Sequence, residues 1–291
     1  MNKALHVKLT LWLTVSVFLV CLTTLGNWAG FKSNLSYDYI VAEHNVAPWG
    51  VLGLCFVWLF MKWKEIRSGM EQGATAVFAG AGIGMAALAC FIPVTADFLL
   101  LKAITIALGV FAVLFGRGSL LPLIIFSTYA FTILFPRFVN AYLELPYALS
   151  MVLPVNWLIN ALGLPVTASG QVFSFLTPSG KEISVLVSGA CAGPATMAVF
   201  ISIFTLMVLD APVSRNRAIP LFLLGVLGTW LQNVLRILII LACGYLIGEK
   251  ALWTAHFYTI YVLFPLWYLL FAAIYFKQYS SFFGKQGKDL E

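Results

Sequence analysis

Long apolar runs separated by short polar segments recur along almost the whole chain. Eight of these runs approach the length of about 20 residues that an α-helix needs to cross roughly 30 Å of hydrocarbon. They lie near residues 9–29, 46–61, 74–95, 98–116, 118–135, 190–210, 219–247 and 257–276. The pattern therefore predicts an all-α polytopic membrane protein with about eight transmembrane helices.

Two segments in the middle of the chain depart from this pattern. Residues 147–163 are apolar but short, and Pro154 interrupts them, which indicates an interfacial or re-entrant helix. Residues 171–187 alternate around a Thr-Pro-Ser-Gly turn, which predicts a short β-hairpin on the outer face. The sequence shows no internal repeat and no separate soluble domain, so we expect one transmembrane domain over 1–277 and a flexible cytoplasmic tail over 278–291.

The basic residues set the predicted orientation. With eight spans and the N-terminus inside, eleven of them are cytoplasmic and four are outside, in agreement with the positive-inside rule. The cytoplasmic set is Lys3, Lys8, Lys62, Lys64, Arg67, Arg117, Arg215, Arg217, Lys277, Lys285 and Lys288, and the outer set is Lys32, Arg137, Lys181 and Lys250. A ninth span at 147–163 would invert one half of this agreement. We therefore expect a multi-pass protein of the cell membrane with both termini cytoplasmic.

Composition supports the membrane interpretation. Hydrophobic residues make up 62% of the chain, charged residues make up 10%, and the mean hydropathy is +0.96, values that lie outside the range of soluble domains. The net charge of +6 comes from residues between the apolar runs, so no nucleic-acid partner is expected. The five cysteines form no Cys-x-x-Cys pair, which argues against a disulfide framework or a zinc site.

Polar residues inside apolar runs are costly unless a function or a partner accounts for them. The first such residue is Cys191. Pro194 suits the first turn of a helix, so Gly193 would cap that helix and Cys191 would lie beside its free amides and the positive end of its dipole. A thiol that only packs at a tight turn is the structural alternative.

Arg236 lies in the next apolar run, with Asn233 one turn before it on the same helix face. About 17 residues of helix, at about 1.5 Å each, would bring Arg236 near the outer boundary of the membrane. There Asn233 could hold the guanidinium group. The structural alternative is an arginine that extends to the headgroups and only anchors the helix.

His256 falls at the outer start of the last span, among aromatic residues where a histidine is often structural. Its importance comes from convergence, because three helices would bring a thiol, a guanidinium and an imidazole to one membrane depth. These are the groups that a cysteine acyl-transfer site needs. We therefore expect an active site near the outer face.

At these residues the sequence resembles the exosortase and archaeosortase family of membrane-embedded cysteine transpeptidases. The family pattern is an Ala-Cys-Ser-Gly type segment, an Asn-x-x-Arg segment on the next helix, and a histidine, or in some branches an arginine, before the last helix. Residues 190–193 (Ala-Cys-Ala-Gly), residues 233–236 and His256 occupy these places. The likeness is strongest over 165–276, and Ala192 departs from it because serine is usual there.

The resemblance implies an enzyme that recognises the C-terminal tail of secreted proteins, made of a short motif, an apolar span and a basic cluster, and cuts near the motif. Cys191 would form a thioester, Arg236 would stabilise the oxyanion or hold the substrate, and His256 would serve as general acid and base. Asn233 and Gly193 would support them. The acyl group would pass to an acceptor such as a membrane lipid, with no cofactor and no metal.

Two other classes of function stay open. A transporter or channel would also place an arginine and an asparagine on a cavity, but the sequence shows no inverted repeat and no pair of broken helices. A noncatalytic membrane assembly protein is the other alternative, and in such a protein Cys191 would be unreactive.

Overall fold

The computed structural model describes residues 3–24, 43–71, 73, 75–94, 98–189 and 191–286. The chain divides into two compact units, Met1–Ile133 (unit 1) and Leu134–Glu291 (unit 2), with the boundary inside helix α8. The expectations of a single domain over 1–277 and of a flexible tail after it stay predictions.

Unit 1 consists of helices. They are α1 (Lys3–Thr24), α4 (Glu43–Met61), α5 (Trp63–Glu71), α6 (Ala76–Phe91), α7 (Leu99–Phe115), the 3-10 helix η1 (Gly116–Ser119) and the first part of α8 (Leu120–Tyr142). Helix α7 packs against both α1 and α6. The crossing with α6 is close, because a Cβ atom on Gly82 would lie 2.4 Å from the Gly109 oxygen and a Cβ atom on Gly109 would lie 2.7 Å from the Gly82 oxygen. The small residues of α6 thus serve helix packing.

Lys102 is buried in unit 1, with 3% of its surface exposed. Its ammonium group donates hydrogen bonds to the backbone oxygens of Cys90 (3.4 Å) and Ile92 (3.2 Å). These carbonyls lie at the C-terminal end of α6, where backbone oxygens lack partners within the helix. Lys102 therefore caps α6, and Asp97, the ion-pair partner that its position in the sequence suggests, lies outside the described residues.

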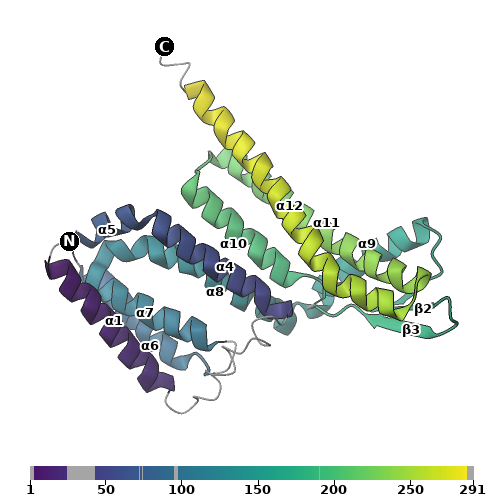
Figure 1. Ribbon diagram of the computed structural model, residues 1–291, viewed down its shortest axis with the longest axis horizontal. Helices are drawn as coiled ribbons and strands as arrows, with labels where there is room; N and C mark the ends of the chain where they lie inside the picture. The colour runs from purple at the N-terminus through teal and green to yellow at the C-terminus, as the bar shows by residue number, and fades with distance from the viewer. Residues whose placement is uncertain are drawn as a thin grey trace. The chain divides into compact units, whose positions relative to one another are not determined.

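Unit 2 combines helices with a small sheet (Figure 1). After the end of α8 come α9 (Glu144–Ala161), β1 (Thr167–Ser169), β2 (Val172–Leu176), β3 (Glu182–Leu186), α10 (Pro194–Asp210), α11 (Arg215–Leu246) and α12 (Glu249–Gln286). Helix α11 packs against α9, α10 and α12. It is therefore the central helix of this unit.

Helix α12 is fixed to its neighbours by polar side chains as well as by an apolar core. Three of its side chains donate hydrogen bonds: Trp267 Nε1 to Thr229 Oγ1 (3.1 Å), Tyr268 OH to the Thr196 oxygen (2.8 Å) and Tyr275 OH to the Ala211 oxygen (2.6 Å). Between these contacts, Phe271 packs edge-on against Phe200. The contacts involve both α10 and α11, so the three long helices of unit 2 form one packed group.

The predicted hairpin is confirmed, and it belongs to a larger sheet. Strands β2 and β3 pair antiparallel, and a third strand, β1, pairs with β2 to give the order β1-β2-β3. Thr177 closes the turn by donating from its hydroxyl to the Lys181 oxygen and accepting from the Lys181 amide. The alternation in β2 buries Phe173 and Phe175 on one face, so that face packs against the core of unit 2.

The sheet lies beside the end of α11 where the chain turns into α12. Phe175 approaches Gly244 of α11 so closely that a Cβ atom there would lie 2.7 Å from the Phe175 ring. Lys181, in the hairpin turn, forms an ion pair with Glu249 at the start of α12. The sheet is therefore attached both to α11 and to the first turn of α12.

The number of spans is not confirmed. Each predicted span overlaps a helix, but within the described residues only four stretches are long and apolar enough to cross a membrane: Leu5–Thr24, Leu99–Tyr142, Arg215–Leu246 and Glu249–Tyr279. A bent pair, Trp63–Glu71 with Ala76–Phe91, would make a fifth. Two predicted spans, 98–116 and 118–135, form the one stretch of 44 residues, because η1 joins α7 to α8 without a gap.

Helix α9 corresponds to the predicted helix over 147–163. It carries Pro154 inside it and is not among the candidate spans of the described ranges. Its buried side chains, including Val155 and Ile159, belong to the same core as residues of α11. Whether this helix lies at the membrane interface or re-enters the membrane stays a prediction.

Candidate active site

Cys191 lies just before α10, as the sequence predicts. Helix α10 begins at Pro194, and Gly193 caps it with a left-handed backbone conformation (φ +86°, ψ 31°). That conformation favours glycine, and space does too, because a Cβ atom on Gly193 would lie 2.8 Å from Cγ of Asn233. Gly193 therefore lets the chain turn at Cys191 while α11 approaches closely.

The turn that carries Cys191 is held at both ends. The Cys191 amide donates to Ser188 Oγ (3.4 Å), and the Ala192 amide donates to the Ser188 oxygen (3.1 Å). On the other side, Asn233 Nδ2 donates to the Cys191 oxygen (3.3 Å). Cys191 itself is half-buried, while Ala192 is fully buried. The backbone of Cys191 is thus fixed although the residue is only half-buried.

Asn233 is buried, with 1% of its surface exposed. Its side-chain nitrogen donates to the Cys191 oxygen, and its side-chain oxygen has no hydrogen-bond partner in the part of the chain that the structure describes. That oxygen is the one atom of the side chain that could accept from a guanidinium group. In this structure Asn233 therefore holds the turn of Cys191 rather than Arg236.

Arg236 lies one turn after Asn233 on α11 and is also buried, with 5% of its surface exposed. Its Nη2 donates to the backbone oxygen of His256 (3.1 Å) on α12. A side chain that only anchors the helix would extend towards the membrane surface. Arg236 instead turns inward and links α11 to the helix that carries the histidine.

His256 lies in the second turn of α12 and is half-buried. The rings of Trp253 and Phe257 lie edge-on to the imidazole, with centroid distances of 5.8 Å and 5.6 Å. Together with the hydrogen bond from Arg236 to its backbone, these rings restrict where the imidazole can move.

The predicted site residues thus meet in one unit. Asn233 connects α11 to the turn of Cys191, and Arg236 connects the same helix to His256. Their apolar neighbours share a core that includes Ala192, Val234, Ile237 and Ala255. Helix α11 carries Arg236 and contacts the backbone of both Cys191 and His256. A thiol, a guanidinium group and an imidazole are the groups that acyl transfer requires.

The other cysteines differ from Cys191 in their surroundings. Cys55 is fully buried in unit 1 and donates to the Ile125 oxygen (3.3 Å). Cys243 is half-buried and packs against the apolar core of unit 2, while Cys21 and Cys90 are exposed. Across the described ranges, no group of three or more His, Cys, Asp or Glu residues could hold a metal ion.

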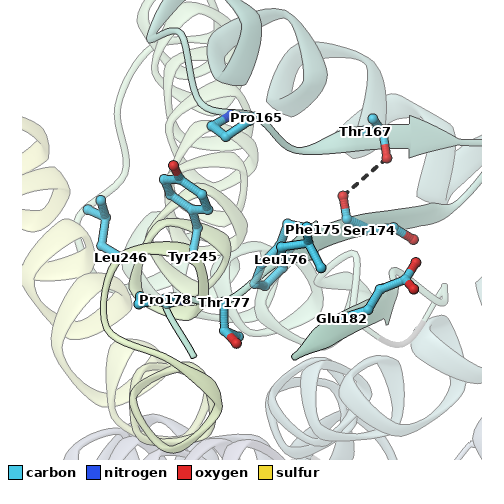
Figure 2. Close-up of a pocket in the computed structure, with 10 residues that line it drawn as sticks. All are labelled: Pro165, Thr167, Ser174, Phe175, Leu176, Thr177, Pro178, Glu182, Tyr245 and Leu246. Atoms are coloured by element: carbon cyan, nitrogen blue, oxygen red, sulfur yellow. Dashed lines mark hydrogen bonds between the residues drawn. The ribbon is translucent and has the colours of Figure 1, made fainter. Parts of the chain in front are cut away.

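Sequence reasoning missed two features of this region. Ser188 caps the turn of Cys191, and a serine three residues before the cysteine is the local signal that could have indicated it. A groove of about 620 Å³ also lies at the far end of the sheet (Figure 2). Tyr245 and Leu246 of α11 lie on one side of it and β2 on the other, and Glu182 is the one carboxylate among its lining residues.

Comparison with known proteins identifies the family. Searches of curated proteins and of solved structures gave no match. The family model described as transmembrane exosortase matches residues 43–273, which is well over half of the chain and includes every predicted site residue. Several apolar helices and this match place the protein in a membrane. The chain belongs to the transmembrane exosortase family.

Proposed function

We propose that this protein cleaves the C-terminal tail of secreted proteins through a thioester on Cys191 and transfers the product to an acceptor. Transmembrane exosortases are cysteine-dependent membrane enzymes that sort proteins, which supports the class of reaction. The observation that carries the proposal for this chain is the pair of hydrogen bonds from α11, Asn233 to the Cys191 backbone and Arg236 to the His256 backbone. One helix thereby positions both the nucleophile and the proton carrier.

The reaction has two steps. The Cys191 thiolate attacks the scissile carbonyl carbon, the C–N bond breaks, and the leaving amine takes a proton from His256. An amine of the acceptor, such as a membrane lipid, then attacks the thioester and gives a proton to His256 while the thiolate leaves. Water in place of the amine would give hydrolysis. The half-buried position of Cys191, on the turn that leads into α10, supports the first step.

Arg236 would stabilise the oxyanion of each tetrahedral intermediate. It is almost completely buried, and a positive charge acts more strongly on a developing negative charge where water is excluded. Its Nη2 donates to the backbone oxygen of His256, and a guanidinium group carries five N–H donors in one plane. The proposal therefore gives Arg236 two tasks, positioning of His256 and stabilisation of the oxyanion.

The location of the site completes the proposal. The excess of basic residues on one side of the predicted topology favours cytoplasmic termini. Helix α11 would then enter from the cytoplasmic side with Arg215 and carry Arg236 towards the outer face, where secreted proteins arrive. A transporter or channel function has less support, because the side chains of Asn233 and Arg236 contact backbone oxygens of neighbouring segments of the chain.

A processing assay tests the proposal. The probe is a secreted reporter that carries the C-terminal tail of a protein encoded beside this enzyme. Cys191→Ala should abolish cleavage of the reporter and leave membrane insertion unchanged, because removing one sulfur atom from a half-buried turn costs little packing.

Cys55→Ala is the control, since it removes a fully buried thiol from unit 1 and should retain cleavage. Full cleavage by Cys191→Ala would contradict a cysteine mechanism and favour a noncatalytic role.

A further inference from the structure

Strand β3 forms one edge of the three-stranded sheet in unit 2. We call the side of β3 that faces away from β2 its outer edge. The hydrogen bonds from the Thr177 amide to the Lys181 oxygen and from the Val187 amide to the Gln171 oxygen, both 2.9 Å, show which residues face β2. Odd-numbered residues from Lys181 to Val187 direct their backbone groups to β2, so those of Glu182, Ser184 and Leu186 point to the outer edge. None of these outward groups hydrogen-bonds to another residue that the structure describes.

Apart from Glu182 at its first residue, this edge lacks the features that usually prevent pairing. Edge strands are commonly protected by proline, by charged side chains, by a bulge or by extreme shortness. Strand β3 has the sequence Glu-Ile-Ser-Val-Leu, pairs with β2 in an unbroken register over all five residues, and exposes Leu186. The opposite edge, β1, is only three residues long. The open edge of β3 is thus suited to receive another strand.

The same strand leads directly to the candidate nucleophile. After Leu186, the chain passes through Val187 and Ser188 and reaches Cys191. The groove next to Glu182 lies at the other end of β3. The five residues of β3 span about 17 Å in the extended conformation, so this length separates the groove from the end of the strand that leads to Cys191. Helix α11 gives the same separation, because the twelve residues from Asn233 to Tyr245 correspond to about 18 Å of helix.

We propose that the outer edge of β3 binds the segment of the substrate that precedes the scissile bond, as an added strand that runs parallel to β3. The inference rests on the proposed function. From Asn233 back to Arg215, α11 extends about 27 Å in the direction away from the sheet, which is close to the thickness of the hydrocarbon. The apolar span of the tail must lie along that part, so the residues before it lie on the side of the sheet.

The length of β3 and the length of α11 from Asn233 to Tyr245 together define the register of the added strand. A substrate residue opposite Glu182 would precede the scissile bond by about five positions, since an extended strand rises about 3.3 Å per residue. Its side chain would reach the groove, where Glu182 favours a side chain with a positive charge. Backbone hydrogen bonds along β3 would provide affinity, and the groove would provide specificity, as in other cases of strand addition.

A proline scan of the two edges tests the proposal. Ser184→Pro removes an outward amide from β3 and leaves the ladder with β2 in place. It should raise the KM for reporter cleavage at least about tenfold, because it removes one hydrogen bond and its ring obstructs the incoming strand. Ala168→Pro removes the outward amide of β1, at the opposite edge, and should behave like the wild type. Ser184→Ala separates the loss of the Ser184–Ser174 hydroxyl contact (2.8 Å) from the effect of the ring.

Disulfide cross-linking in the Cys191→Ala variant tests the same edge without cleavage. Leu186→Cys should cross-link to cysteines placed next to the scissile bond, and Glu182→Cys to cysteines about four positions further upstream. A reversed order, or no dependence on position, would overturn the parallel strand, as would a Ser184→Pro variant that matches Ala168→Pro. An ordered pattern of cross-links with no cleavage by the wild type would instead overturn the proposed function alone.

Discussion

Unit 1 and unit 2 each bury a positively charged side chain in apolar surroundings. Lys102 and Arg236 expose 3% and 5% of their surfaces, and each donates to backbone oxygens of a neighbouring helix. Lys102 reaches the C-terminal end of α6, where free carbonyls need a donor. Arg236 reaches a carbonyl in the second turn of α12, where a helix does not lack donors. The first contact completes a helix end, whereas the second one positions a particular residue, His256.

The thiols of the two units differ in the same way. Cys55 donates to the Ile125 oxygen and lies 3.5 Å from the Thr128 hydroxyl, within the packing of unit 1. Cys191 lies at a helix N-terminus, on a turn that Ser188 and Asn233 hold from two sides. Lys102 and Arg236 are thus buried to a similar extent, and what differs is the acceptor, which lies at the end of α6 for Lys102 and within α12 for Arg236.

Arg236→Lys is expected to lower cleavage more than any other variant in this comparison. A lysine keeps the charge but lacks the planar set of donors that can hold His256 and an oxyanion together. We expect turnover of the tail reporter to fall by about 10² to 10³, the usual cost of losing one oxyanion donor. Single-turnover cleavage would measure this loss.

Lys102→Met is the matched variant in unit 1. It removes the buried cation of unit 1. Membrane insertion and thermal stability should be measured alongside cleavage for both variants. The rate of cleavage per inserted molecule should stay close to that of the wild type. Equal losses for both variants would mean that Arg236, like Lys102, serves only the packing of its helices.

A second test compares two glycines with a positive φ, Gly193 beside Cys191 and Gly180 in the hairpin turn. Gly193→Ala places a Cβ atom in a left-handed conformation and 2.8 Å from Cγ of Asn233, so the Asn233 side chain or the turn that carries Cys191 must shift. A misplacement of about 1 Å can lower the rate by up to about 10², and we expect a loss of that order in kcat.

Gly180→Ala is the control for backbone strain. Gly180 has a similar φ of +78°, but a Cβ atom there meets nothing within 4 Å. It should lose about 1 to 2 kcal/mol of stability and keep the rate of cleavage. A similar rate for the two alanine variants would show that the approach of Asn233 to Gly193 is not important for the reaction.

Features with local signals could be predicted from the sequence. The start of α10 follows from a glycine before a proline, and the hairpin follows from the turn at Thr177 and the alternation on both sides of it. The short strand β1 has neither signal, since Thr-Ala-Ser is exposed throughout. Span number also could not be fixed from hydropathy, because η1 joins two apolar windows into one stretch of 44 residues.

Partners across helices could not be predicted. The spacing of Asn233 and Arg236 places them on one face of α11, and from this alone a contact between them is a reasonable hypothesis. In the folded protein, α10 and α12 approach that face from two sides, and each residue finds a backbone carbonyl there. Which carbonyl each one meets depends on tertiary packing, which a single sequence does not specify.

The smallest effect is expected from Asn233→Ala. The variant removes the hydrogen bond to the Cys191 oxygen and leaves the thiol, Arg236 and His256 in place. One neutral hydrogen bond contributes about 1 kcal/mol, so kcat should fall about fivefold. Because Asn233 acts on the nucleophile and not on the tail, KM should not change. Gln232→Ala, one residue earlier on α11, is the control and should retain the wild-type rate. A rise in KM with an unchanged kcat would show instead that Asn233 contacts the substrate, with its side-chain oxygen as the available acceptor.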